Sequence, residues 1–435
     1  MDEKPSHSSD SLYVKTFRRI PVVFYLIKWL IITLLIGAGA GTASAWFLFS
    51  LEWATDFRES HLFMIALLPL GGLAVGLLYH YFGKRVEKGN NLILEQIHSP
   101  KKILQFRMAP MVFGGTVITH LFGGSAGREG TAIQMAASIA DQFTGLFKLR
   151  PRDRKILLIA GMAAGFGSVF GTPLAGAVFG LEVFFLGRIR YDAILPAFMA
   201  SVFADHVTRM WNAHHSHYSV SFIPEADFQN VLYAIVAGIC FGLAGRAFAK
   251  ATHKWGGFLK KHIKYPPFRP VVGGVIIAAL VYLTGTTKYI GLGLPTISAA
   301  FSEPLPAYDF AAKLIFTAIT LGAAYKGGEV TPLFFIGATL GNALAYVLPM
   351  PVAVLAGIGF VGVFAGAANT PLACTLMAIE LFGAEIGIFA GIACVTAYMF
   401  SGHAGIYSSQ VIGMPKHLKY GRDKNRKIGD AGEKR

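Results

Sequence analysis

Long apolar runs with almost no charged residues dominate this chain and limit what it can fold into. Only 14% of its 435 residues are charged, whereas 54% are hydrophobic. A typical soluble domain carries roughly 25% charged residues. The composition excludes a disordered chain, a collagen and a disulfide-stapled secreted domain. It predicts an all-α polytopic membrane protein.

Glycine and proline interrupt many of the apolar runs. GMAAGFGSVFGTPLAGAVFG (161–180) and GIGFVGVFAGAANTPLA (357–373) are two examples. Interrupted backbone is tolerated at membrane depth only where it is buried in protein or lines a polar cavity. We therefore expect many of the helices to be short, tilted or interrupted.

An internal repeat organises the chain. GTPLAGAVFGLE (171–182) and NTPLACTLMAIE (369–380) share Thr, Pro, Leu, Ala and a final Glu at the same spacing. Such a repeat predicts two related halves, and transporters built in this way commonly place the ion site where the halves meet, at helix N-termini. The expected divisions are a cytoplasmic N-terminal segment (1–20), a first repeat (21–215), an inter-repeat linker (216–228), a second repeat (229–415) and a basic cytoplasmic tail (416–435).

The net charge of +15 is concentrated in short segments beside the apolar runs. Lys84–Lys88, RPRDRK (150–155) and the tail from Lys416 are all basic. Positive charge beside membrane spans indicates the cytoplasmic side. We expect a multi-pass protein of the cell inner (plasma) membrane, surrounded by membrane lipid, with both termini in the cytoplasm. Nucleic acid is not an expected partner, because no basic stripe is interleaved with aromatic residues.

Two carboxylates lie directly before apolar helices. Glu129 lies in GGSAGREGT (123–131), before a helix expected to start near Thr131. Glu329 lies in YKGGEVTP (325–332), before a helix expected to start at Pro332. Unpaired backbone N–H groups and the helix dipole attract anions to such a place, and a glutamate there can occupy the anion site itself. The alternative is a carboxylate that only caps its helix.

Two further polar breaks carry hydrogen-bond donors. Asn90 and Asn91 lie in EKGNNLI (87–93), and their amides could serve an anion, although Gly-Asn is also ordinary turn chemistry. Tyr407 lies in SGHAGIYSSQ (401–410), where a tyrosine near a helix end is often an interfacial anchor.

Taken in order, the four breaks resemble the CLC family of anion channels and anion/proton antiporters. The family's GSGIP, GREGP and GxFxP segments and its late tyrosine appear as GNNLI (89–93), GREGT (127–131), GEVTP (328–332) and Tyr407. We expect Glu329 to be a second acid that assists gating and proton transfer. The resemblance implies two membrane repeats of inverted topology and a homodimer without cofactor or metal, in which Glu129 gates the path and transfers protons. The anion-binding residues that it implies are Gly89, Asn90, Asn91, Arg128, Gly130, Val330, Thr331 and Tyr407.

Departures from the family pattern indicate which branch the chain resembles. Asn90 replaces the usual serine, Thr131 replaces the proline of GREGP, and Glu329 replaces an apolar residue. The inner proton-donor glutamate of chloride antiporters is Val183 here. This set is similar to the fluoride-exporting branch, which implies fluoride/proton antiport and fluoride resistance. A chloride channel, favoured by Val183, and a chloride/proton antiporter, favoured by Glu129, remain the alternatives.

Two further motifs are less specific indicators of function. GGSAG (123–127) fits the G-x-S-x-G pattern with His120 one turn away, so an intramembrane serine hydrolase is a remote alternative, although the α/β context it needs is absent. His214, His215 and His217 could suggest a metal site, but no cysteine or carboxylate cluster completes one. We expect a polar loop there and no metal.

Overall fold

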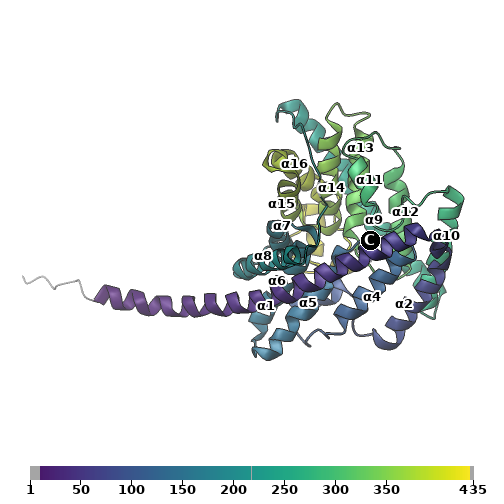
Figure 1. Ribbon diagram of the computed structural model, residues 1–435. Coiled ribbons are helices and arrows are strands. Elements are labelled where there is room, and N and C mark those ends of the chain that lie inside the picture. Colours follow the sequence, from purple (N-terminus) through teal and green to yellow (C-terminus); the bar gives the residue numbers. More distant parts are fainter. Residues whose placement is uncertain (1–9, 217, 432–435) are drawn as a thin grey trace, which may run out of the picture.

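Helices make up nearly all the regular structure of residues 10–216 and 218–431, the part of the chain that the computed structural model describes (Figure 1). The first half comprises α1 (Asp10–Ser60), η1 (Leu62–Leu67), α2 (Leu68–Phe82), α3 (Asn90–His98), α4 (Met108–Leu121), α5 (Glu129–Leu146), α6 (Pro151–Phe170), α7 (Pro173–Glu182), β1 (Phe185–Leu186), η2 (Tyr191–Ala193) and α8 (Ile194–Met210). The second half comprises α9 (Phe228–His262), α10 (Phe268–Thr284), α11 (Leu294–Ala299), α12 (Asp309–Gly322), α13 (Val330–Leu344), α14 (Val352–Ala368), α15 (Pro371–Phe382), η3 (Ala384–Ile386), α16 (Gly387–Phe400), β2 (Val411–Ile412), η4 (Leu418–Asp423) and η5 (Ile428–Asp430).

Most of these helices are too short to cross a membrane alone, which confirms the predicted architecture. Within the described residues, three helical stretches are long and apolar enough to span: Val22–Ser60, Leu62–Phe82 and Phe228–His262. Seven further apolar helices have only 10–17 residues. The first turns of α1 extend beyond the body of the protein (Figure 1).

The repeated Thr-Pro junctions show how the sequence breaks its helices. Gly171 and Asn369 end α6 and α14 in the left-handed conformation, with φ of 72° and 60°. Proline then occupies the first helical position of α7 and α15, where its missing N–H costs nothing. Each junction therefore separates a long buried helix from a short one.

The two halves repeat the same helix order. Helices α12, α13 and α14 begin at residues 309, 330 and 352, each 201 residues after α4, α5 and α6 begin at 108, 129 and 151. The halves join at the first turns of α5 and α13, where Gly127 and Gly328 exchange backbone hydrogen bonds of 2.6 and 2.7 Å. This junction lies where the repeat predicted the site.

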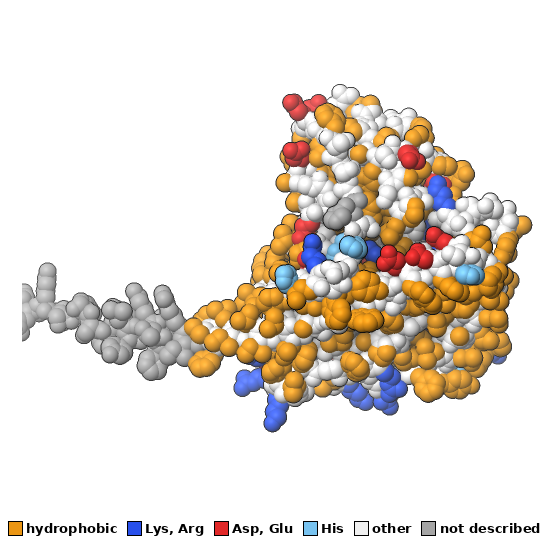
Figure 2. Space-filling view, viewed as in Figure 1, with side chains coloured by type: hydrophobic (Ala, Val, Ile, Leu, Met, Phe, Trp, Pro, Cys, Tyr) orange, Lys and Arg blue, Asp and Glu red, His pale blue; other side chains and the backbone are white. Residues whose placement is uncertain are grey.

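The surface carries the pattern expected of a membrane protein. Figure 2 shows a broad band of apolar side chains, with Lys and Arg gathered along the lower edge and acidic side chains above the band. Large apolar residues such as Trp46, Leu70 and Leu283 are more than half exposed. Such residues favour a lipid environment.

Candidate functional site

Glu129 joins the two halves of the protein through its side chain. Its carboxylate is fully buried and accepts hydrogen bonds from the Thr331 hydroxyl (2.5 Å), the Thr331 backbone N–H (3.0 Å) and the Arg128 backbone N–H (3.1 Å). The Arg128 guanidinium Nε lies 3.6 Å from the carboxylate. A negatively charged group thus occupies the N-terminal end of α13, which is a preferred position for an anion.

Both helices at this junction start two residues earlier than expected. Helix α5 begins at Glu129 rather than near Thr131, and α13 begins at Val330 rather than at Pro332. Each predicted carboxylate is therefore part of the helix end itself. Val330 is the first residue of α13 and is fully buried beside the carboxylate-binding Thr331.

Glycines allow the two helix ends to come this close. A Cβ added at Gly328 would lie 2.7 Å from the backbone nitrogen of Gly130, and one added at Gly127 would lie 2.9 Å from the Glu129 carboxylate. Real Cβ atoms do not approach other atoms so closely, so any side chain would force the halves apart. The glycines are required by packing between the repeats.

Asn90 and Glu329 lie on the same side of this junction. A Cβ added at Gly130 would lie 3.1 Å from Asn90 Nδ2 and 3.6 Å from Glu329 Oε2. Asn90 starts α3 and is preceded by Gly89, whose φ of +56° suits glycine. The predicted pair of acids and the asparagine amide are thus brought together around one glycine.

Tyr407 approaches from the loop after α16. Its ring is buried and meets the Phe179 ring edge-on at a centroid distance of 6.5 Å. The loop is held by a hydrogen bond from Ile406 N–H to the Ala367 carbonyl.

Asn90 Oδ1, Arg128 Nε and the Tyr407 hydroxyl are three of seven buried side-chain atoms that have no hydrogen-bond partner among the described residues, although Arg128 Nε lies 3.6 Å from the Glu129 carboxylate. Buried polar atoms are nearly always hydrogen-bonded, so each exception needs an explanation. Arg128 Nε and the Tyr407 hydroxyl can donate to a ligand, whereas Asn90 Oδ1 is an acceptor and can serve only a donor such as water.

Asn91 differs from its neighbour. Its side-chain oxygen accepts a hydrogen bond of 2.9 Å from the Ser409 backbone N–H, in the loop that carries Tyr407. Only its NH₂ group remains for an anion, and its side chain fastens α3 to the tyrosine loop.

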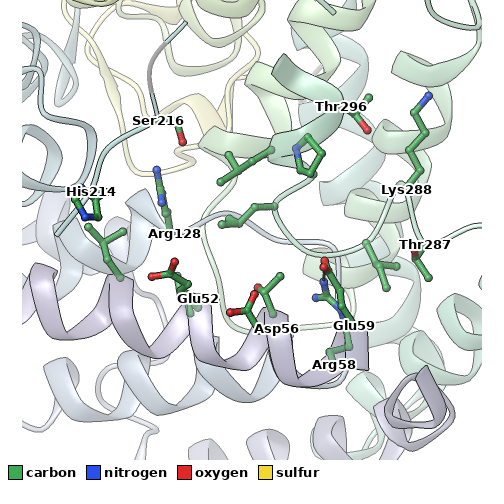
Figure 3. Close-up of a pocket in the computed structure, with 18 of the residues that line it drawn as sticks. Glu52, Asp56, Arg58, Glu59, Arg128, His214, Ser216, Thr287, Lys288 and Thr296 are labelled. Carbon is green, nitrogen blue, oxygen red and sulfur yellow. Dashed lines mark hydrogen bonds and ion pairs between the residues drawn. The ribbon is translucent and has the colours of Figure 1, made fainter. Parts of the chain in front are cut away.

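A cavity of about 740 Å³ leads to Arg128 from the end of α1 (Figure 3). Glu52, Asp56 and Glu59 project into it from α1, and Arg128 lies above Glu52 with its guanidinium directed toward Ser216 (Figure 3). The cavity gives the Glu129 junction an approach from one face of the molecule.

Sequence reasoning missed a second buried polar network. Gln410 donates to the carbonyls of Val183 (2.8 Å) and Ala368 (3.2 Å) and accepts from Asn369 (2.9 Å). Lys416 donates to the Asn369 side-chain oxygen at 2.5 Å. A glutamine after a glycine-rich break gives no local signal of these contacts, because its partners lie 41, 42 and 227 residues away along the chain.

Residues 427–429 also pack in a way that the basic composition did not indicate. Ile428 and Gly429 donate backbone hydrogen bonds of 2.9 Å to Gln410 and Ser408. Lys427 pairs with Glu95 of α3 at 3.2 Å. Residues 427–429 therefore fold back against the tyrosine loop.

A reciprocal pair of glutamates was also missed. Glu182 at the end of α7 accepts from the Leu372 and Ala373 N–H groups of α15. Glu380 near the end of α15 accepts from the Leu174 and Ala175 N–H groups of α7. The matching final Glu of the sequence repeat was the available signal.

The hydrolase alternative is not supported by the geometry. The Ser125 hydroxyl pairs with Thr317 at 2.8 Å. Both ring nitrogens of His120 lie against carbonyl oxygens, those of Thr116 and Ala126. The serine and the histidine therefore do not form a nucleophile–base pair.

The histidine-rich loop offers no cluster that could hold a metal within the described residues. His215 bonds to the Ser168 carbonyl at 2.9 Å, and His217 lies outside the described residues.

Comparisons with known proteins agree with the sequence pattern. The family model described as voltage gated chloride channel matches residues 71–402. A "Chloride/fluoride channel protein" of Pseudomonas syringae pv. tomato is 53% identical over 410 residues, which cover 92% of this chain and 91% of the relative.

Solved structures share the fold. The crystal structure of a CLC-type fluoride/proton antiporter matches with a TM-score of 0.86 and 34% identity, covering 89% of this chain and 98% of that chain. A slow cyanobacterial Cl⁻/H⁺ antiporter matches with a TM-score of 0.75 and 21% identity, covering 86% and 94%, and supports the fold alone. The chain is a multi-pass helical membrane protein and belongs to the CLC family of chloride and fluoride channels and antiporters.

Proposed function

We propose that this protein is an antiporter that exports fluoride in exchange for protons and thereby gives fluoride resistance. The observation that carries the proposal is the Glu129 carboxylate, which takes three hydrogen bonds at the meeting point of α5 and α13. An anion that replaced this carboxylate would find the same donors. Protonation of Glu129 would weaken the hydrogen bonds that these donors make to its carboxylate. The position would then be available to fluoride.

The donor set suits a small, strongly hydrated anion. Fluoride needs strong hydrogen-bond donors to replace its water. We assign this role to the Thr331 hydroxyl, the Asn90 amide, the Tyr407 hydroxyl, and the backbone N–H groups near Gly130 and Val330. The Tyr407 hydroxyl, which has no hydrogen-bond partner among the described residues, and the Asn90 Nδ2 group beside Gly130 support this assignment. The names of the relative from Pseudomonas and of the solved antiporter support fluoride as the cargo.

Proton transfer needs a second acid in this proposal. Val183 is fully buried and carries no proton. Glu329, whose carboxylate lies beside Gly130 near Glu129, is the residue that we propose for this step. Carboxylates within a membrane are costly, which makes each a functional candidate.

A chloride channel or a chloride/proton antiporter is the second candidate, because Val183 removes the inner acid and one relative is named for both halides. Proteoliposomes loaded with fluoride or chloride separate the candidates. We expect fluoride efflux with proton uptake and much slower chloride efflux. Equal rates for both halides would favour the chloride function, and fluoride efflux without proton movement would indicate a channel.

We also propose a homodimer in the plasma membrane with both termini in the cytoplasm. Exposed apolar side chains lie on the neighbouring helices α7, α8, α15 and α16, among them Leu174, Val202, Leu372 and Val395. A second copy could cover this face. Single-molecule photobleaching of labelled protein in bilayers should show two bleaching steps. The proposed cytoplasmic location of the termini has a separate test. Cysteines introduced in the tail should react only with a membrane-impermeant reagent applied from the cytoplasmic side.

A further inference from the structure

A second cavity, separate from the Glu129 junction, lies between the ends of α2 and α10. It has a volume of about 240 Å³ and is lined by Tyr79 and His80 of α2, by Arg269 of α10, and by Lys84 and Lys326 from loops. Helices α2 and α10 pack with Gly72 and Gly76 against Pro270 and Pro267, so the last turns of α2 meet the start of α10. The cavity is therefore at one end of this helix pair.

The lining carries an excess of positive charge. Lys84, Arg269 and Lys326 face a single carboxylate, Glu87, and His80 can add a further donor. Neither Lys326 nor Arg269 is in a salt bridge among the described residues. The cavity thus favours an anion that can satisfy several cations at once.

Lys326 is held in place by contacts that leave its charge available. Its Nζ lies 4.0 Å from the centre of the Tyr79 ring, and its stem packs on α4, where a Cβ at Gly115 would lie 3.0 Å from its Cγ. Arg269 donates through Nε to the Ile263 carbonyl at 3.1 Å, which fixes the guanidinium and leaves its two NH₂ groups for a ligand. Two positioned cations with spare donors are suited to a phosphate group.

The surroundings indicate the depth of a lipid headgroup. Tyr81, Phe82 and Phe268 are exposed beside the cavity, at 66%, 64% and 51%. Exposed aromatic residues next to basic residues are typical of the membrane–water interface. Farther along the same helices, Leu70 and Val275 are exposed apolar residues that would face acyl chains. Basic pockets between helices on the cytoplasmic side bind anionic headgroups.

We propose that this cavity binds the phosphate group of an anionic phospholipid, with Arg269 and Lys326 as its principal ligands and Lys84 at its entrance. Lys326 is two residues before Gly328, which pairs with Gly127 at the Glu129 junction. A bound headgroup would therefore steady the loop that carries Glu329. The binding itself does not depend on which halide the protein transports.

Native mass spectrometry of the full chain in detergent tests the proposal. Phosphatidylglycerol should form adducts at concentrations about tenfold lower than phosphatidylcholine, whose headgroup has no net charge. The double variant R269Q/K326M should lose this preference. The matched control K101Q/K102Q, which removes two exposed lysines elsewhere, should keep it. Equal binding of the two lipids, or unchanged preference in R269Q/K326M, would overturn the proposal.

Two further arms separate a lipid headgroup from a soluble phosphate and from a loss of fold. K326R keeps the charge and should bind phosphatidylglycerol like the wild type, and elution of every variant at the wild-type position in gel filtration checks the fold. Inorganic phosphate at millimolar concentration should displace little lipid. Tight binding of inorganic phosphate with no lipid preference would show that the site serves a soluble phosphate and would contradict the lipid assignment.

Discussion

The helix pair α7 and α15 and the helix pair α5 and α13 both join the two repeats, but only the first pair is symmetric. Glu182 binds the first turn of α15, and Glu380 returns the same contact to α7. At the other pair, Glu129 binds the first turn of α13. No hydrogen bond from the Glu329 side chain to α5 occurs within the described part of the chain.

The 201-residue spacing shows where the second pair departs from symmetry. Gly127 and Gly328 correspond and pair with each other, whereas Arg128 corresponds to Glu329 and Glu129 corresponds to Val330. Thr131, which follows Glu129, bonds to Thr116 within its own half. We infer that the symmetric contacts hold the repeats together and that the asymmetric ones serve transport.

Glu329→Gln tests the asymmetric helix pair through its effect on proton-coupled fluoride flux. If Glu329 carries protons, proton-coupled fluoride flux should fall at least about tenfold, which corresponds to about 1.4 kcal/mol in the barrier. Thermal stability in detergent should change little, because the side chain makes no bond across the repeats to any described residue. Fluoride and pH electrodes on proteoliposomes measure both fluxes. Wild-type proton flux in this variant would remove Glu329 from the mechanism.

The symmetric pair should respond in the opposite way. Glu182→Ala and Glu380→Ala each leave two N–H groups without their carboxylate, which should cost about 1–3 kcal/mol of unfolding free energy. The proton-to-fluoride ratio should stay at the wild-type value. Denaturant titration in mixed micelles gives the stability, with the exposed Glu385→Ala as control. A changed coupling ratio would show that this pair also takes part in transport.

The two threonines are expected to differ in their effect on ion selectivity. Thr331→Val removes the hydroxyl bond to the anion position, and loss of a hydrogen bond to a charged group costs about 1.5 kcal/mol or more. The fluoride-to-chloride flux ratio should fall about tenfold. Thr131→Val is the matched control and should leave the ratio within about twofold, because its hydroxyl bonds to Thr116. If the fluoride-to-chloride flux ratio fell equally in both variants, the ends of α5 and α13 would not differ in their role in selectivity.

Features coded by short segments were predictable. The interrupted helices follow from local glycines and prolines, and the placement of Glu129 and Glu329 at helix starts follows from GREGT and GGEVTP. The repeat indicated that these two helix starts meet. Helix propensity and turn chemistry act within a few residues, so the sequence reveals them directly.

Contacts between distant segments were not predictable. The hydrogen bond from the Leu372 N–H to the Glu182 carboxylate joins residues 190 positions apart, and the bond from the Ser409 N–H to Asn91 joins residues 318 positions apart. No local pattern distinguishes Asn91, which fastens a loop, from Asn90, whose oxygen has no partner among the described residues. Such choices depend on how close the backbones pack, which only the assembled fold determines.

Fluoride-driven proton uptake by Glu129→Gln tests the central claim most directly. Glutamine keeps the shape of the side chain and can still accept a hydrogen bond, but it cannot ionise or carry a proton. We predict that an outward fluoride gradient will move fluoride through this variant without any proton uptake, while the wild type moves both ions. Proton uptake at the wild-type ratio in Glu129→Gln would contradict the account.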